Sequence, residues 1–351
     1  MQSVVRRLLA KPFDIRTEFL HSPREFITSF PGRMLTKPFR VAAELRSTMD
    51  IMRLRRLPAH PSAAALPAVA GELPAAARQC AVLLSGPLLW AHTSEEILAT
   101  AHELGYDGVE LWAYQLLRDE ADPAAVAERA RELGLTVTLH ALSWDLNPTS
   151  RLPGVRRASQ DALAQSVELA AALSAQLLVM HPGHTSAPQD DSASYWPTLI
   201  TSVREIAEQA AAHRLRVGVE HMEAREAEYL ITPDDANRLV REVDRPNVGT
   251  VLDIAHIPWG EDETRFLQRL DRIIHVHLSD ADESRLHLPL GQGTRDLVRI
   301  LGALGAYRGS VALEGFSISA GGDLARWNKA QFEELWREAA SSTQEPMGAP
   351  S

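Results

Sequence analysis

The chain of 351 residues has 45% hydrophobic and 23% charged residues, an ordinary composition for a globular protein. Its single cysteine, Cys80, excludes a disulfide framework and any zinc site built from several cysteines. One cysteine is also typical of a reducing compartment, so we expect a cytoplasmic protein. The few lysines all lie outside the predicted strands, which argues against a Schiff-base enzyme.

Charge is unevenly distributed along the chain. Residues 1–60 carry 12 Lys and Arg against 5 Asp and Glu, whereas residues 61–351 carry 24 against 41. An acidic main part repels the phosphates of nucleic acids. We therefore expect a small-molecule substrate and no nucleic-acid partner, and the sequence leaves homo-oligomerisation open.

Residues 1–60 are interpreted as a basic N-terminal extension that is partly disordered. They contain no apolar run long enough for a secretory signal or a transmembrane segment. Their basic and apolar clusters could also form an amphipathic arm that docks on a membrane surface or a partner. Prolines and acidic residues interrupt such a helix and favour the first interpretation. Residues 61–78 are rich in Ala and Pro and are expected to be a linker.

From Cys80 onward, short apolar segments alternate with amphipathic ones. The apolar segments are rich in β-branched residues and predict eight strands. These are 80–85, 108–112, 135–140, 175–181, 216–220, 248–253, 273–279 and 309–314. Between and after them, capping residues and helical periodicity predict helices. These are 93–105, 122–134, 155–173, 195–213, 233–241, 264–270, 294–304 and 323–339.

Alternation of strands and helices predicts parallel strands joined by right-handed crossovers. Eight units over about 260 residues favour a closed (β/α)8 TIM barrel. We place this barrel at residues 79–340, followed by a disordered tail at 341–351. An open doubly wound sheet is the alternative, but the first strand is followed by no G-x-G-x-x-G, and the chain has no P-loop.

Polar residues gather at the predicted carboxyl ends of the strands, where TIM barrels place their active sites. Strand ends and the loops after them contribute His140, His181, Glu220, Asp253, His256, His277, His287 and Glu314. Converging carboxylates repel one another, and a bound divalent cation relieves this repulsion. Histidine and carboxylate ligands together favour Zn, Mn or Fe. The sequence therefore predicts a metal site.

Five short motifs resemble the sugar phosphate isomerase/epimerase superfamily, the xylose isomerase-like TIM barrel group that includes endonuclease IV. They are GYDGVELW at 105–112, LVMHPGH at 178–184, LDIAH at 252–256, HVHLSD at 275–280 and LGQG at 290–293. The resemblance covers about residues 80–340. Each motif alone is weak, but their order and spacing are specific for the superfamily.

The resemblance implies that Glu220, Asp253, His277 and Glu314 hold one divalent metal ion. It also implies that Glu220 and Glu314 are the catalytic acid–base pair. A metal-polarised carbonyl acidifies the adjacent C–H, so one carboxylate can remove that proton and the other can return it. We expect a metal-dependent isomerase or epimerase that acts on a small sugar, sugar phosphate or polyol. His256 would position a substrate hydroxyl or join the metal ligands.

The endonuclease IV pattern implies nine ligands for three zinc ions. Eight recur here, namely His140, His181, Glu220, Asp253, His256, His277, His287 and Glu314. Arg285 stands where the ninth, an aspartate, is expected, and a cation there weakens the third ion. We therefore expect one or two ions of Zn, Mn or Fe. Arg285 is interpreted as a substrate contact. Glu110 is interpreted either as a substrate contact or as a hydrogen-bonded carboxylate at the edge of the core.

Other functions stay open at this stage. An endonuclease IV-like phosphodiesterase or hydrolase is the first alternative, although the acidic main part and Arg285 argue against a nuclease. A lyase or dehydratase could use the same four ligands. A barrel without catalysis is disfavoured by the nearly complete ligand set. The turn Gly291–Thr294 could bind an anion with free N–H groups or be a plain turn.

Overall fold

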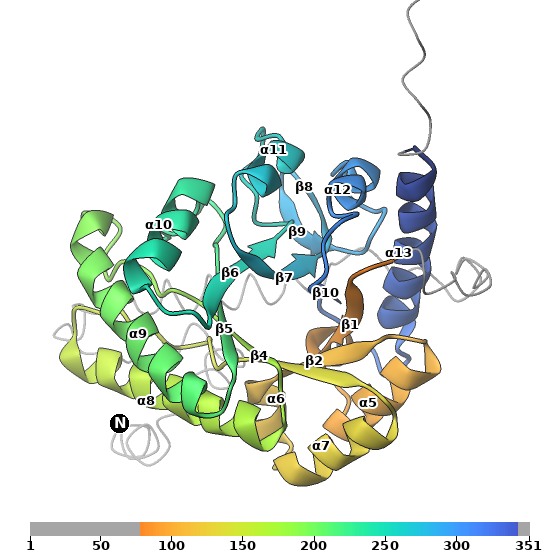
Figure 1. Ribbon diagram of the computed structural model, residues 1–351, viewed down its shortest axis with the longest axis horizontal. Coiled ribbons are helices and arrows are strands. Elements are labelled where there is room, and N and C mark those ends of the chain that lie inside the picture. The colour runs from red at the N-terminus through yellow and green to blue at the C-terminus, as the bar shows by residue number, and fades with distance from the viewer. Residues whose placement is uncertain (1–77, 343–351) are drawn as a thin grey trace, which may run out of the picture. The chain divides into compact units, whose positions relative to one another are not determined.

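The computed structural model describes residues 78–342, and eight parallel strands form the centre of this part (Figure 1). They are β1 (Ala81–Ser85), β2 (Gly108–Trp112), β3 (Thr136–His140), β4 (Leu177–Met180), β5 (Arg216–Glu220), β6 (Val248–Asp253), β7 (Ile273–Leu278) and β10 (Ser310–Leu313). The strands close into a barrel in the order β1-β10-β7-β6-β5-β4-β3-β2. The predicted (β/α)8 TIM barrel is confirmed, and every strand lies within its predicted range.

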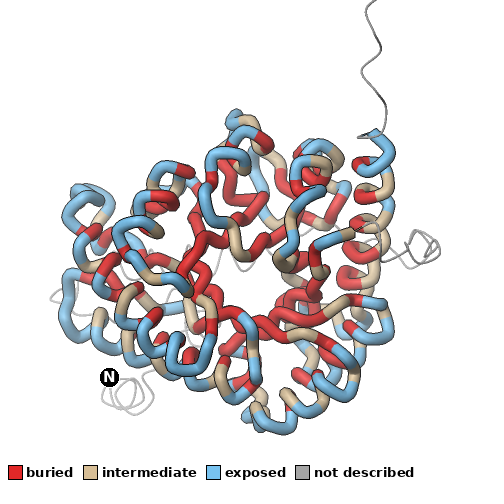
Figure 2. The backbone as a smooth tube through the Cα atoms, viewed as in Figure 1, coloured by how far each residue is buried: buried red, intermediate tan, exposed pale blue. Residues whose placement is uncertain are grey.

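Helices surround the barrel on its outside (Figure 1). They are α5 (Ser94–Glu103), α6 (Ala113–Arg118), α7 (Pro123–Glu132), α8 (Pro153–Ala172), α9 (Trp196–Ala212), α10 (Pro233–Val243), α11 (Glu263–Gln268), α12 (Leu297–Ala303) and α13 (Asp323–Ser342). Figure 2 shows that the strands are buried while the outer faces of the helices are exposed. Within the described residues, no helix is both long enough and apolar enough to span a bilayer.

Three predicted segments fall largely outside the described residues. The extension at 1–60 and the linker at 61–78 lie outside them, apart from Arg78. The tail expected at 341–351 also lies outside, apart from Ser341 and Ser342, which end α13. The boundaries of these segments therefore stay predictions.

Small residues on two adjacent strands leave room for the apolar side chains that fill the barrel. A Cβ atom on Gly218 of β5 would lie 2.5 Å from Cγ2 of Val251, and one on Gly249 of β6 would lie 2.6 Å from Cγ2 of Ile274. Because side chains two residues apart share a strand face, Glu220 faces the same side as Gly218, and Asp253 the same side as Val251. The interior of the barrel thus changes from apolar to acidic towards the carboxyl ends of its strands.

Capping residues set the starts of several helices where the sequence predicts them. Thr93 and Glu96 form a reciprocal capping box at the start of α5, and Asp122 caps α7 ahead of Pro123. These caps satisfy N–H groups that a helix leaves without partners in its first turn. They also fix where the loops that follow β1 and β2 end.

The unpredicted short features include two 3-10 helices, η3 (Gly86–Leu89) and η4 (Ser192–Tyr195), one short α-helix and one hairpin. Helix α6 follows β2 directly, and its six residues are too few to show helical periodicity. An antiparallel hairpin of β8 (Asp280–Asp282) and β9 (Arg285–Leu288) lies between β7 and α12. Strands of three and four residues give no clear alternation, so the sequence offered no signal for this hairpin. The hairpin positions His287 beside the barrel mouth.

Candidate metal centre

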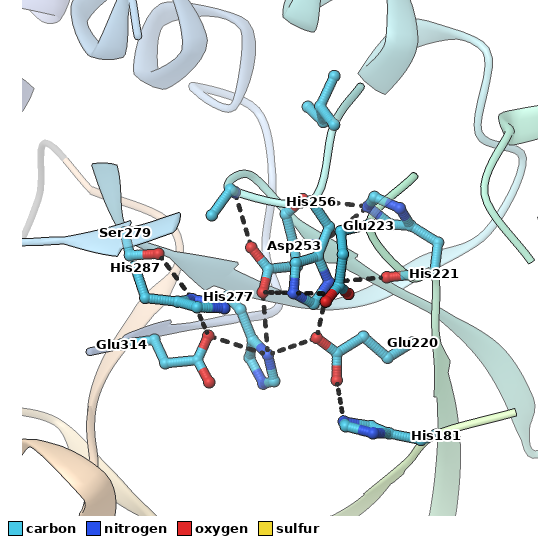
Figure 3. A network of polar contacts seen from close by, with 12 residues as sticks. His181, Glu220, His221, Glu223, Asp253, His256, His277, Ser279, His287 and Glu314 are labelled. Atoms are coloured by element: carbon cyan, nitrogen blue, oxygen red, sulfur yellow. Dashed lines mark hydrogen bonds and ion pairs between the residues drawn. The ribbon is translucent and has the colours of Figure 1, made fainter. Parts of the chain in front are cut away.

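The imidazole of His277, on β7, lies among three carboxylates (Figure 3). Its Nδ1 is 3.3 Å from Oε1 of Glu220 and 3.6 Å from Oε2 of Glu314. The same nitrogen is 4.0 Å from Oδ2 of Asp253. Strands β5, β6 and β7 and the residue after β10 therefore bring together the four side chains that the sequence predicted as metal ligands.

Glu110 fixes the orientation of the His277 ring. Nε2 of His277 is 3.0 Å from Oε1 of Glu110, and Nε2 of His275 is 2.9 Å from its Oε2. With Nε2 protonated towards Glu110, Nδ1 presents its lone pair to the other carboxylates. Burial opposes ionisation of Glu110, but the charges of His277 and His275 hold its pKa below the usual range.

The position of Glu110 favours one of the two roles expected for it. The residue is fully buried, and its carboxylate is occupied by two histidines and by Thr138, whose Oγ1 donates to it at 3.3 Å. A side chain enclosed in this way is placed to orient His277, a candidate metal ligand, and its described contacts are all with the protein. These contacts favour the interpretation of Glu110 as a hydrogen-bonded carboxylate, and substrate binding by Glu110 stays a prediction.

The carboxylates of the buried cluster differ in the direction of their pKa shifts. Burial raises the pKa of Asp253, and the charge of Glu314 raises it further. Burial also opposes ionisation of Glu314, but the charges of His277 and His287 lower its pKa to about 2. Histidine charges thus lower the pKa of Glu314, whereas burial and a neighbouring carboxylate raise the pKa of Asp253.

The residues present fit a divalent cation. Oε2 of Glu220, Oδ2 of Asp253 and Oε2 of Glu314 are buried and accept no hydrogen bond. Histidine nitrogens lie near the oxygens of Glu220 and Glu314, but burying carboxylate oxygens that accept no hydrogen bond is costly, and a cation among them lowers this cost. Nitrogen and oxygen donors in this mixture suit Zn, Mn or Fe better than Ca.

Two further histidines face the second oxygen of Glu220. Nε2 of His181 is 3.2 Å and Nε2 of His140 is 3.6 Å from Oε2 of Glu220. Nδ1 of His140 lies 2.9 Å from the carbonyl oxygen of Ala141, which leaves Nε2 free to face the carboxylate. The structure thus places both residues where the sequence predicted additional ligands.

A third group lies on the other side of Asp253. Ligand atoms of Asp253, His256 and His287 all lie within 4.8 Å of one another. Nδ1 of His287 is 3.4 Å from Oε2 of Glu314. Burial alone would lower the pKa of His287, but the charge of Glu314 raises it to about 9. All eight predicted ligand residues therefore meet at one end of the barrel, and their coordination of an ion stays a prediction.

Arg285 pairs with an aspartate of its own hairpin. It lies on β9, where its Nε donates to Oδ2 of Asp282 at 2.9 Å, and its side chain is 46% exposed. An arginine neutralised by its own hairpin is poorly placed to recognise a second anion. Substrate binding by Arg285 therefore stays an untested prediction with little geometric support.

The turn at Gly291–Thr294 does not offer free N–H groups to an anion. The backbone N–H groups of Gly291 and Gly293 donate to Oδ2 of Asp280 at 3.1 and 2.8 Å. Arg295 N–H donates to the other oxygen of Asp280 at 3.3 Å. The anion-binding interpretation is therefore wrong, because a carboxylate of the chain already occupies these donors.

Glu223 is a residue of the site that the sequence did not reveal. It follows β5 by three residues and is almost fully buried beside His256 (Figure 3). Strand periodicity ends at Glu220, so no pattern predicts where a glutamate in the following loop will point. Its glutamate–histidine contact appears only once β5 and β6 are placed side by side.

Aromatic side chains border the metal centre. Trp90 lies 5.6 Å from Tyr114 and 5.1 Å from Trp144, measured between ring centroids. Trp112 stacks on His140 at 4.2 Å and contacts Trp144 at 5.6 Å. Tyr114 and Trp144 are 45% and 48% exposed. An accessible apolar surface therefore adjoins the histidine and carboxylate cluster.

A family model described as a xylose isomerase-like TIM barrel matches residues 98–344. The chain belongs to this family. The match covers most of the chain and every predicted ligand, and it confirms the resemblance inferred from the five motifs.

Curated relatives carry different names. A protein of Methanocaldococcus jannaschii, MJ1311, is 28% identical over 193 residues, which are 52% of this chain and 65% of that protein. A 3-dehydroshikimate dehydratase of Pseudomonas aeruginosa is 29% identical over 241 residues, which are 64% of this chain and 36% of the dehydratase. A ketose 3-epimerase of Arthrobacter globiformis is 26% identical over 254 residues, which are 70% of this chain and 84% of the epimerase. The chain thus spans less than two thirds of the length of MJ1311 and of the dehydratase.

Solved structures share the fold. A D-tagatose 3-epimerase-like protein has a TM-score of 0.66 and 22% identity, with 75% of this chain and 99% of that chain covered. An L-ribulose 3-epimerase has a TM-score of 0.65 and 19% identity, with 77% and 100% covered. At this level of identity, the likeness establishes the architecture of the barrel.

Proposed function

We propose that the protein is a divalent-metal-dependent isomerase or epimerase that acts on a small sugar, sugar phosphate or polyol. One observation carries the proposal: Glu220 and Glu314 face Nδ1 of His277 from two different sides, at 3.3 and 3.6 Å (Figure 3). Two carboxylates on either side of one centre match a reaction that removes a proton and returns it.

Glu220, Asp253, His277 and Glu314 would hold the cation. When bound, it polarises a substrate carbonyl and lowers the pKa of the adjacent C–H. One of the two glutamates then accepts this proton, and the electron pair of the C–H bond delocalises into the carbonyl. The other glutamate gives a proton to the same carbon from the opposite face, which inverts its configuration. In an isomerisation, the proton goes instead to the former carbonyl carbon, and the hydroxyl proton of the first carbon moves to the former carbonyl oxygen.

The aromatic border supports a carbohydrate substrate. Sugars combine hydroxyl groups with apolar C–H faces, and ligand sites generally pair apolar walls with a few polar groups. Trp112 and Trp144 supply such a wall next to His140. The ketose 3-epimerase of Arthrobacter globiformis, aligned over 84% of its length, is a relative whose name fits this substrate class.

Deuterium exchange tests the proposal. Ketopentoses and ketohexoses are incubated in deuterated water with the zinc- or manganese-loaded protein, and proton NMR follows the C–H next to the carbonyl. We expect this signal to be lost as the epimer or isomer forms. Glu220→Gln and Glu314→Gln should each slow exchange by about 10²–10⁴-fold, because each removes a proton-transfer group. Glu226→Gln, an exposed residue of the β5–α10 loop, is the control.

The double variant sharpens this test. Because the two glutamates act as one unit, Glu220→Gln with Glu314→Gln should be little slower than either single variant. Products without deuterium would contradict the acid–base role of Glu220 and Glu314. An isomer formed without deuterium would indicate an intramolecular hydride shift, and the protein would then still be an isomerase. Cleavage of a phosphoester without any exchange would refute the proposal and favour the hydrolase.

A dehydratase is the second candidate, supported by the 29% identity to the Pseudomonas aeruginosa dehydratase. It begins with the same proton removal. The electron pair then forms a C=C bond, and the β-hydroxyl group leaves as water after receiving a proton from the second glutamate. The product is a conjugated enone that absorbs in the ultraviolet. Growth of this absorbance with a hydroxy-ketone substrate, in place of an epimer, would select the dehydratase.

A further inference from the structure

Two carboxylates face one imidazole nitrogen of His256. Nε2 of His256 is 3.5 Å from Oε2 of Glu223 and 3.5 Å from Oδ2 of Asp253. Nδ1 of the same ring lies 3.0 Å from the carbonyl oxygen of His221, so Nδ1 carries the proton that this oxygen accepts. Nε2 therefore presents a lone pair to two acidic side chains.

The described residues compensate this convergence only in part. His256 and Glu223 side chains are each 6% exposed, and Asp253 is fully buried. Oδ2 of Asp253 and both oxygens of Glu223 accept no hydrogen bond, although Arg225 pairs with Oε1 of Glu223 from the surface. Oε2 of Glu223 is left facing His256. Nε2 of His256 thus lies against two buried carboxylate oxygens that accept no hydrogen bond, an arrangement that a cation beside this nitrogen would stabilise.

We propose that Glu223 is a ligand of a second divalent cation, held together with Asp253, His256 and His287. Bonds of about 2.0–2.2 Å in a tetrahedral site separate neighbouring ligand atoms by roughly 3.4 Å. The two 3.5 Å separations around Nε2 of His256 match this spacing. Ligand atoms of His287 lie within 4.8 Å of those of Asp253 and His256. Nitrogen and oxygen donors of this kind suit Zn, Mn or Fe.

Arg285 stands where the endonuclease IV pattern has an aspartate ligand, and Glu223 would compensate for the loss of that ligand. Arginine at that position removes a carboxylate from the hairpin, and the structure pairs Arg285 with Asp282 instead. Glu223 approaches His256 from the loop after β5 and supplies the missing negative charge from another direction. The inference goes beyond the proposed function, which needs only the cation at His277.

Metal titration of matched variants tests the site. Wild-type, Glu223→Gln and Glu226→Gln proteins are freed of metal with a chelator and titrated with zinc by calorimetry, and bound zinc is then counted by mass spectrometry. We expect Glu223→Gln to bind one ion fewer, or to bind it more than about 100-fold more weakly, since loss of an outer partner alone costs 10–100-fold. The tightest ion should be unaffected, and Glu226→Gln should match the wild type.

Two results would overturn this inference. One is a wild-type protein that binds a single zinc ion, and the other is a Glu223→Gln protein with the stoichiometry and affinities of the wild type. Neither result bears on the cation at His277, so the proposed function would stand. Crystals of the zinc-loaded wild type give a readout that needs no variant: an anomalous peak between Glu223 and His256 supports the site, and a peak at His277 alone contradicts it.

Discussion

At the scale of single residues, the tautomer of His277 decides which of its nitrogens can bind a metal. Glu110 faces Nε2 at 3.0 Å and thereby leaves Nδ1 to the carboxylates of the site. The sequence identified His277 and the carboxylates because they recur at strand ends. It could not decide the role of Glu110, because Glu110 lies in the middle of β2 and its partners His275 and His277 lie on β7, far away in the sequence.

Glu110→Gln tests this positioning role. The substitution keeps the shape of the side chain and removes the charge that holds the imidazole, so zinc affinity should fall by about 10–100-fold. Zinc titration of the refolded or native variant measures this loss, with Glu95→Gln on the exposed first turn of α5 as control. Unchanged zinc affinity in Glu110→Gln would contradict the role.

Cys80 gives a second residue-scale prediction. Burial raises the pKa of its thiol to about 11, although the charge of Arg78 opposes the shift. At pH 8 only about 0.1% of the thiol is ionised, and the thiolate is the reactive form. A thiol-specific dye should therefore react negligibly with the native protein and fully after denaturation in urea. Rapid labelling of the native protein at pH 8 would show that the environment of Cys80 is open.

At the scale of elements, each barrel strand was predictable because β-branched runs, turns and helix caps agree along the chain. The hairpin of β8 and β9 was not, since its strands contain three and four residues. Glu223 was missed for a related reason: its partner His256 follows a different strand, and only the pairing of β5 with β6 brings the two loops together.

Gly218 tests the packing inside the barrel. A Cβ atom there would lie 2.5 Å from Cγ2 of Val251, so Gly218→Ala must displace a neighbouring strand or side chain. Overpacking of this kind costs about 1–3 kcal/mol of unfolding free energy. Urea unfolding measures the loss. Gly154→Ala in α8 is the control, because a Cβ there meets nothing within 4 Å. Equal unfolding free energies for the two variants would mean that the barrel interior accommodates the extra methyl group without strain.

At the scale of the whole molecule, the barrel lies entirely within the described residues. The eight strands of the barrel and the helices that follow them lie between Ala81 and Ser342. We expect a protein lacking residues 1–77 to remain folded and to bind metal as the full chain does. Circular dichroism during heating, together with a zinc titration, checks this. Loss of cooperative unfolding in the shortened protein would assign residues 1–77 to the core of the fold.

The account depends most on the cation that Glu220, Asp253, His277 and Glu314 are proposed to hold. Metal analysis by mass spectrometry tests this most directly, on wild-type and His277→Ala proteins purified without chelators and incubated with Zn, Mn and Fe. The predicted result is at least one divalent ion per wild-type chain and about one fewer in His277→Ala. A wild-type chain that stays free of metal after this incubation, or a His277→Ala chain with an unchanged metal content, would contradict the account.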